Sequence, residues 1–275
     1  MVGFTYATQS PVRTPIMPSM AGWRLVVVLG GVVMLAACTR AAEETAPSSP
    51  TPTASASIGV PSPKPDEGRL LPRGETVAAH PRKRYVEMRK RLDDPASVFV
   101  LDTRNPFMHR VPMLVTDARR DAGGEPWYRV LLPVKPNGSA AWVRGTEVRL
   151  VPRDQKIVVD LSERTLDHYV DGDLADHLSV GVGTPSAPTA TGTFYVWIRV
   201  RYSSPTGPYG PFALGLSGFS EVLSEWPGGG RMAIHGTSDP SDRGHAVSHG
   251  CVRVYNPELK VLRHVPLGTP VIIKR

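Results

Sequence analysis

From residue 97 to its end, the chain is a series of short runs of β-branched and aromatic residues separated by turns that contain glycine or proline. Such punctuation suits strands and hairpins, and the totals of 26 Gly and 28 Pro do not suit a bundle of long helices. Hydrophobic residues make up 41% of the 275 residues, which is enough for a sizeable core. We therefore expect a mostly β protein.

The runs fall into two groups, which we expect to be two domains. The first group covers 92–152 and predicts a small all-β barrel of about five strands; its runs are 97–102, 111–117, 127–134 and 141–151. The second group covers 155–275; its runs are 157–161, 165–170, 174–182, 192–200, 232–235, 247–255 and 270–274. Residues 201–230 show little periodicity and form a stretch longer than an ordinary connecting loop, so we expect a binding or lid loop there.

Aromatic residues mark the strands of the first group. Trp127, Tyr128 and Trp142 lie in runs that resemble strands of bacterial SH3-like modules of envelope proteins. Side chains of this kind pack in a core or at its rim more often than they form a platform for a ligand. The resemblance implies an SH3-like β module at 92–152.

The N-terminal residues have the layout of an export signal. Residues 1–37 hold two arginines and no acidic residue, and 25–37 are uncharged and mostly apolar. A membrane-spanning helix needs about 20 such residues, so this shorter run predicts a signal peptide. Its end, LAAC, finishes at Cys38 and resembles a bacterial lipobox, which implies that lipid on Cys38 anchors the exported protein to the cytoplasmic membrane or cell envelope. The alternative is an ordinary signal peptide with an incidental cysteine.

Residues 38–91 are expected to be a tether followed by a basic segment. The stretch 46–65 is rich in Pro, Ser, Thr and Ala, a composition that makes an extended, solvated chain. The basic segment at 82–91 predicts a short polar helix or a connection with a solvated face. Its alternative role is electrostatic contact with anionic polymers of the envelope.

The net charge of +7 is unevenly distributed. Residues 151–275 hold 12 Lys and Arg against 12 Asp and Glu, whereas 38–150 hold 18 against 13. The basic excess therefore belongs to the tether and the first β group. A neutral C-terminal half in an exported protein argues against nucleic acid as a partner.

The chain has two cysteines, Cys38 and Cys251, which excludes a disulfide-rich scaffold and an all-thiolate zinc ribbon. Cys251 has a distinctive setting, with IHGT at 234–237 followed by AVSHGCVR at 246–253. His235 and His249 precede it by 16 and 2 residues, and an imidazole can accept the proton of a thiol.

These residue types suit nucleophilic attack by a thiol. An ordinary cysteine has a pKa of about 8.5, so it needs a base or a positive neighbour to attack a carbonyl at neutral pH. Residues 249 and 251 would share one face of an extended segment, and His235 would come from another strand. The amides of Gly250 and Cys251 are candidate donors to an oxyanion, and glycine at 236 and 250 lets the backbone approach a substrate closely.

Three other interpretations of Cys251 stay open. It can be an inert buried thiol, or it can form a disulfide with Cys38. The third is a metal site, for which the ligand types are acceptable but the spacing is not a recognised one; its candidate ligands are His235, Asp239, Asp242, His245, His249 and Cys251. Two histidines and two glycines around the cysteine favour the nucleophile, and we expect no metal or other cofactor.

With these motifs, residues 155–275 resemble the catalytic domain of L,D-transpeptidases, the YkuD-like family, whose hallmark is His-Gly followed by Ser-His-Gly-Cys. The chain has both blocks in this order, supported by VDLS at 159–162, PTATGTF at 188–194, GPFAL at 210–214 and GTPV at 268–271. The resemblance implies a β-sandwich catalytic domain, and the Asn256-Pro257 step predicts a short C-terminal helix.

The resemblance also implies roles for individual residues. Cys251 would be the nucleophile, His235 the general base and acid, and His249 a further catalytic group. Four residues would position the substrate or its oxyanion; they are Gly236, Ser248, Gly250 and Arg253. Arg253 stands where some relatives have Asn, so it would either bind a substrate carboxylate or hold the loop.

The implied reaction is peptidoglycan cross-linking. Cys251 would attack the third residue of a donor stem peptide, release D-alanine and form a thioester, and an acceptor stem would then complete a 3→3 cross-link. Carbapenem-type inhibitors would acylate the same thiol. Two alternatives stay open, an L,D-carboxypeptidase with water as acceptor and an inactive peptidoglycan-binding lipoprotein. An ordinary imidazole pKa for His235 further predicts a rate that changes across neutral pH.

Overall fold

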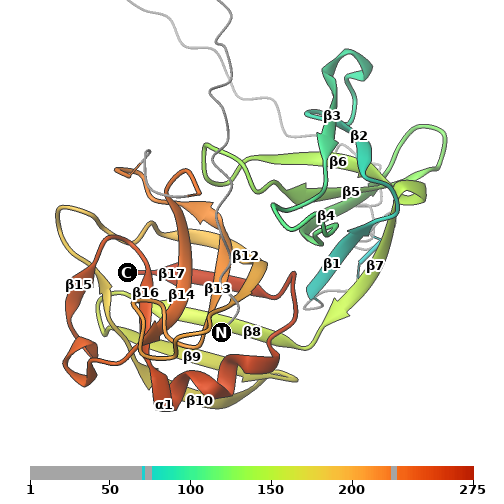
Figure 1. Cartoon of the computed structure of the whole chain (residues 1–275). Coiled ribbons are helices and arrows are strands. Elements are labelled where there is room, and N and C mark those ends of the chain that lie inside the picture. Colours follow the sequence, from blue (N-terminus) through green and yellow to red (C-terminus); the bar gives the residue numbers. More distant parts are fainter. Residues whose placement is uncertain (1–69, 72–75, 224–227) are drawn as a thin grey trace, which may run out of the picture. The chain divides into compact units, whose positions relative to one another are not determined.

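The computed structural model describes residues 70–71, 76–223 and 228–275 (Figure 1). The predicted signal peptide, Cys38 and most of the predicted tether lie outside these described residues. In the described ranges, no helix is long and apolar enough to cross a membrane. The chain is mostly β, as expected, and its two large sheets belong to one compact unit.

The first sheet is antiparallel and has seven strands in the order β3-β2-β6-β5-β4-β1-β7. Its strands are β1 (Thr76–Pro81), β2 (Tyr85–Arg89), β3 (Val98–Asp102), β4 (Met113–Arg120), β5 (Pro126–Leu131), β6 (Ala140–Arg144) and β7 (Val148–Arg153). The expected single run 141–151 is two strands, because a 3₁₀ turn at Gly145–Glu147 separates β6 from β7. The SH3-like assignment stays a prediction.

The boundary expected at residue 92 is wrong for this sheet, which begins at Thr76. The predicted polar helix at 82–91 is also wrong, since these residues include β2. Val86 and Met88 are buried while Tyr85 and Glu87 are exposed, which is the alternation of a strand with one buried face. The dense charges around β2 concealed this alternation in the sequence.

The second sheet has eight strands in the order β10-β9-β8-β17-β12-β13-β14-β16. Its strands are β8 (Gln155–Asp160), β9 (Thr165–Val170), β10 (Asp173–Ser179), β12 (Gly192–Arg201), β13 (Phe212–Phe219), β14 (Arg231–Thr237), β16 (Val252–Tyr255) and β17 (Pro270–Lys274). β11 (Val182–Gly183) and β15 (Ala246–Ser248) form a separate parallel pair. The short C-terminal helix is confirmed as α1 (Asn256–Leu259), with Pro257 in its first turn, followed by a 3₁₀ turn at Lys260–His264.

β13 lies inside the stretch 201–230 that was expected to be a loop. All eight of its residues are buried, so the strand shows no alternation of polar and apolar residues. Two glycines are required by packing: a Cβ on Gly215 would lie 2.5 Å from Ile198 Cγ2, and one on Gly218 would lie 2.3 Å from the Phe194 ring. Glycines that indicate a turn in the sequence are therefore sites of close packing in the sheet.

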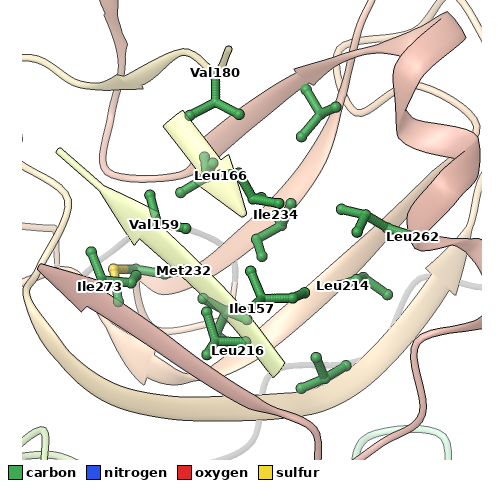
Figure 2. Packing of buried hydrophobic residues seen from close by; sticks show 14 of the residues in the cluster. Ile157, Val159, Leu166, Val180, Leu214, Leu216, Met232, Ile234, Leu262 and Ile273 are labelled. Carbon is green, nitrogen blue, oxygen red and sulfur yellow. The ribbon is translucent and has the colours of Figure 1, made fainter. Parts of the chain in front are cut away.

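The core of the second sheet joins strands that are distant in the sequence. Figure 2 shows that side chains of β8, β13, β14 and β17 pack together, among them Ile157, Leu214, Ile234 and Ile273. This core holds the strands that carry the candidate site in fixed positions.

β12 buries both of its faces. Phe194 and Val196 point into the core of the second sheet, while Tyr195 and Trp197 pack with the core of the first. The uninterrupted apolar run of β12 is explained by this double burial. The two sheets therefore share a packed boundary along β12.

Candidate active site

The pairing of β14 with β16 brings the two halves of the motif together. These strands are parallel, with Ile234 opposite Val252 and His235 opposite Arg253. The same register places Cys251, just before β16, beside Ala233, whose backbone N–H interacts with the thiol. Because side chains two positions apart share a face, His235 and Cys251 open on the same side of the sheet.

Six of the seven predicted site residues line one pocket of about 220 Å³; they are His235, Ser248, His249, Gly250, Cys251 and Arg253. Gly236, the residue after His235, is buried and does not line the pocket. Several residues that the sequence did not predict also line the pocket, and they include Tyr209, Ser220, Leu223, Arg231 and Met232. These come from the ends of β13 and β14 and from the loop before β13, where no motif marks them.

His235 is held as a neutral imidazole with one free nitrogen. Its side chain is 3% exposed, and its Nδ1–H donates to the carbonyl oxygen of Gly236 at 2.9 Å. This bond assigns the proton to Nδ1 and leaves Nε2 as an acceptor. Burial lowers the pKa of His235 to about 4, with a smaller opposing effect from the Gly236 carbonyl. The imidazole is therefore unprotonated at neutral pH.

The thiol of Cys251 is also mainly neutral at rest. Burial raises the pKa of Cys251, while the Ala233 N–H and the positive charge of Arg253 lower it by less. Among the described residues no hydrogen bond joins this thiol to His235, although both face the same pocket. The pair is suited to general-base catalysis, in which the proton leaves the thiol during attack, and not to a preformed thiolate.

A tight turn presents Cys251. Ser248 Oγ donates to the Cys251 carbonyl at 2.5 Å and accepts the Gly250 N–H at 3.1 Å. The chain bends at His249 and Gly250, and Gly250 has φ +109°, so the expected extended segment with residues 249 and 251 on one face is wrong. The Gly250 amide is occupied by Ser248, whereas the Cys251 amide has no partner among the described residues and can serve an oxyanion.

Arg253 lies beside both reacting groups. It lowers the pKa of His235 and of Cys251, and its Nη1 donates to the buried carboxylate of Asp242 at 3.3 Å. Asp242 also accepts the Thr237 hydroxyl at 2.7 Å, which fixes it behind the site. Nε of Arg253 is buried and has no partner among the described residues. Asp242 therefore holds the Arg253 guanidinium in place, and this guanidinium keeps an N–H group that can donate to a carboxylate.

An aromatic pair lies beside His235. Tyr209 contacts the His235 ring edge-on at 5.1 Å between centroids and stacks on Tyr202 at 5.2 Å. Burial raises the pKa of Tyr202, with smaller effects from Tyr209 and the nearby Cys251. This part of 201–230 does border the site, as expected for a binding loop.

No metal cluster accompanies the site. Within 76–223 and 228–275, no group of three or more His, Cys, Asp or Glu side chains is arranged to hold an ion. Asp242, one of the alternative ligands proposed from the sequence, is instead engaged with Thr237 and Arg253.

The 133–137 turn of the first sheet supports the walls of the site from outside the pocket. Asn137 Nδ2 donates to the Phe219 carbonyl at 2.8 Å, and its Oδ1 accepts the Phe219 N–H at 2.9 Å. Arg231, which lines the pocket, donates to the Pro133 carbonyl at 3.2 Å and stacks on Trp197 at 3.7 Å. These contacts hold the end of β13 and the start of β14, where the pocket is built.

We expect Asn137→Ala to loosen the pocket, although Asn137 does not line it. The variant removes two hydrogen bonds and leaves a half-buried amide and carbonyl of Phe219 unpaired, which costs about 1–3 kcal/mol of unfolding free energy. Acylation of Cys251 should slow several-fold. Ser139→Ala is the matched control, since its hydroxyl bonds only Pro136 in the same turn. Equal acylation rates in both variants would show that the 133–137 turn does not shape the site.

Comparison with known proteins agrees with this geometry. Residues 154–273 match the profile of the family described as YkuD, L,D-transpeptidase catalytic domain. The chain is 33% identical over 120 residues to the putative L,D-transpeptidase YkuD of Bacillus subtilis and 36% identical over 119 residues to that of Bacillus licheniformis. Each alignment covers 43% of this chain, which spans 65% and 64% of the two relatives.

Solved structures of the same class also align. The NMR structure of the catalytic domain of the Enterococcus faecium L,D-transpeptidase acylated by ertapenem shares 26% identity, covers 44% of this chain and 97% of that domain, and has a TM-score of 0.34. L,D-transpeptidase 3 from Mycobacterium tuberculosis with a faropenem-derived adduct shares 15% identity, covers 55% and 91%, and has a TM-score of 0.36.

The profile match and the site define the class of the C-terminal part. Residues 154–273 are a YkuD-type L,D-transpeptidase catalytic domain. The resemblance stated for 155–275 is thereby confirmed.

Proposed function

We propose that this chain is an exported L,D-transpeptidase that cross-links peptidoglycan through a thioester at Cys251. The observation that carries the proposal is the convergence of Cys251, His235 and Arg253 on one pocket within a domain of this family. At about 220 Å³ the pocket is smaller than those that enclose drug-sized ligands, roughly 300–1,000 Å³, and suits the end of a stem peptide.

In the first step, the donor stem acylates Cys251. Its sulfur attacks the carbonyl carbon of the third residue of the donor stem while its proton passes to Nε2 of His235. The Cys251 N–H stabilises the oxyanion, and Arg253 binds the terminal carboxylate of the leaving residue. His235 then returns the proton to the departing amine, the C–N bond breaks, and D-alanine leaves a thioester behind.

In the second step, the acceptor replaces the thiol. A side-chain amine of a neighbouring stem attacks the thioester carbon and gives its proton to His235. The C–S bond breaks, the proton returns to the sulfur, and a 3→3 cross-link forms. Carbapenems would acylate the same sulfur through their strained lactam carbonyl.

Purified protein incubated with tetrapeptide stems tests this function directly. Mass spectrometry should find cross-linked dimers, free D-alanine and a transient adduct on Cys251. Tripeptide without dimers would instead indicate a carboxypeptidase, in which water takes the acyl group. Stems that bind without any adduct or product would indicate an inactive peptidoglycan-binding protein.

We also propose that Cys38 carries the lipid that anchors the exported protein. The proposal rests on the lipobox-like LAAC at 35–38, which ends at Cys38. Several acyl chains on this cysteine would hold the protein at the membrane stably, whereas a single chain binds only marginally. Cys38→Ala should move the protein from the membrane fraction to the soluble fraction and remove its label after growth with a radioactive fatty acid. Cys251→Ala, which removes the other thiol, should stay labelled and membrane-bound. Unchanged labelling of Cys38→Ala would reject the anchor.

A further inference from the structure

The first sheet carries a basic groove that the active site does not use. It has a volume of about 750 Å³, and we define the basic groove by the cationic and aromatic residues that line it, which are Arg89, Lys90, Arg91, Arg119, Arg120 and Trp142. Two acidic residues, Asp93 and Asp121, also line it, so five positive charges face two negative ones. Residues 76–153 as a whole hold 15 Lys and Arg against 8 Asp and Glu.

Two segments that are distant in the sequence supply the walls. Residues 89–93 comprise the end of β2 and the residues after it, and residues 119–123 comprise the end of β4 and the start of its connection to β5. The sheet order places β6 and β5 between β2 and β4, so the two walls are separated by two strands. A groove with cations on both walls, two strands apart, is better suited to an extended molecule that carries repeated negative charges than to a single anion.

Tryptophan rings hold the arginines in place. The Arg89 guanidinium lies 4.5 Å from the Trp127 ring centroid, and that of Arg119 lies 5.5 Å from Trp142. A guanidinium stacked on an aromatic face keeps its N–H groups free at the edge, which is the arrangement that binds phosphate or carboxylate oxygens. Nε of Arg89 is buried and finds no partner among the described residues.

The nearby carboxylates leave most of these charges uncompensated. Asp94 pairs with Arg91, and Asp117 pairs with Arg119 at 3.1 Å. Asp121 is occupied by the indole N–H of Trp127 at 2.9 Å, the main cause of its lowered pKa, and by two backbone N–H groups.

Three cations of the groove are therefore not neutralised by a carboxylate, although Arg89 donates to the Leu92 carbonyl at 3.3 Å and Arg120 to the Gly124 carbonyl at 2.8 Å. Among the described carboxylates, none forms an ion pair with Arg89, Lys90 or Arg120. Lys90 and Arg120 are also exposed and stand on opposite walls.

We propose that the basic groove binds an extended polyanion whose repeated phosphate or carboxylate groups run between the two walls. Arg89 and Arg120, on opposite walls, donate to oxyanions of the polymer, and Lys90 adds charge at the rim. A lipid surface is disfavoured, because none of the large exposed hydrophobic side chains of the described residues lines the groove. The site is separate from the pocket of Cys251, so it would tether the enzyme to an anionic polymer and leave the chemistry unchanged.

Binding of the purified full-length protein to linear polyphosphate and to polyglutamate tests the proposal. Lys90→Glu with Arg120→Glu reverses one charge on each wall and should weaken binding roughly ten-fold, since each exposed contact contributes modestly. Rising salt should weaken the wild type in the same direction. The control, Lys260→Glu with Arg263→Glu, makes the same change in net charge at exposed positions of the second sheet's C-terminal turn and should bind as the wild type does.

Four outcomes would overturn the proposal. Equal loss in both double variants would mean that net charge alone drives binding, and undiminished binding by the groove variant would exclude the groove. Inorganic phosphate that binds as tightly as polyphosphate would indicate a single-anion site. Binding only to vesicles of equal parts phosphatidylglycerol and phosphatidylcholine would indicate a lipid surface. Carbapenem acylation of Cys251, measured in parallel, should be equal in all variants and confirms that each is folded.

Discussion

Cys251→Ala should abolish acyl transfer while the protein stays folded. Removal of a covalent nucleophile lowers turnover by a factor on the order of 10⁴ or more. The variant should give no mass adduct with a carbapenem or a tetrapeptide stem, because Cys251 is the only thiol in the described pocket. Its unfolding free energy should change by about 1 kcal/mol or less, since the side chain is small and partly exposed.

Cys251→Ser is the informative companion variant. It keeps an oxygen nucleophile in the same turn, so weak binding of stems should persist while the adduct is lost or greatly slowed. Cross-links formed by purified Cys251→Ala at the wild-type rate would contradict the thioester mechanism. Loss of thermal stability in both variants would instead assign the residue a structural role.

His235→Gln should slow acylation by about 10²–10⁴-fold, the usual contribution of a general base. Glutamine keeps a polar side chain of similar length in the buried site but cannot accept and return the proton. His245→Gln is the matched control, because His245 lies before the same turn, is exposed and does not line the pocket. Stopped-flow acylation by a carbapenem measures both variants, and equal rates would remove His235 from the mechanism.

The pH dependence of acylation gives the same residue a second test. Burial lowers the pKa of His235 to about 4, so the base form persists down to that pH and the rate should be level across neutral pH. The sequence predicted an acylation rate that changes across neutral pH, on the assumption that His235 has an ordinary imidazole pKa. The lowered pKa of His235 removes the reason for that change. An acid limb near pH 6.5 in the wild type would show that the base is not this buried histidine.

Stability should respond to acid before activity does. The unfolded chain protonates a histidine at a pKa of about 6.5, whereas folded His235 takes up its proton near 4. The unfolded state therefore binds more protons between these values, and the free energy of unfolding falls as pH drops through this window. His80, whose pKa burial and the Arg153 charge lower to about 4, adds a loss of the same sign. Acylation rates at low pH are accordingly compared at a temperature where circular dichroism shows a folded protein.

Local patterns predicted much of the fold because they reflect short-range physics. The strand at Thr165–Val170 and the one at Pro270–Lys274 lie where the sequence placed them, since a turn precedes each of them. β13 was missed because a strand buried on both faces has no alternation and its glycines imitate a turn. β2 was missed because charged residues on its exposed face and flanks outnumber its two buried ones.

The chemistry of the site was likewise predictable from the sequence only in part. The Ser-His-Gly-Cys turn identified the candidate nucleophile, because a glycine with positive φ and a serine that bonds both sides of the turn are needed within four consecutive residues. The protonation states of Cys251 and His235 were not predictable, because burial sets them and burial depends on the whole sheet.

Sequence alone thus indicated the candidate reactive groups and the β character of the chain, since both depend on neighbouring residues. Tertiary structure decided which groups meet. The parallel register of β14 and β16 unites His235 with Cys251, and the order of the first sheet sets Lys90 opposite Arg120 across two strands. Strand pairing between distant segments is a long-range contact, and no local pattern encodes its register.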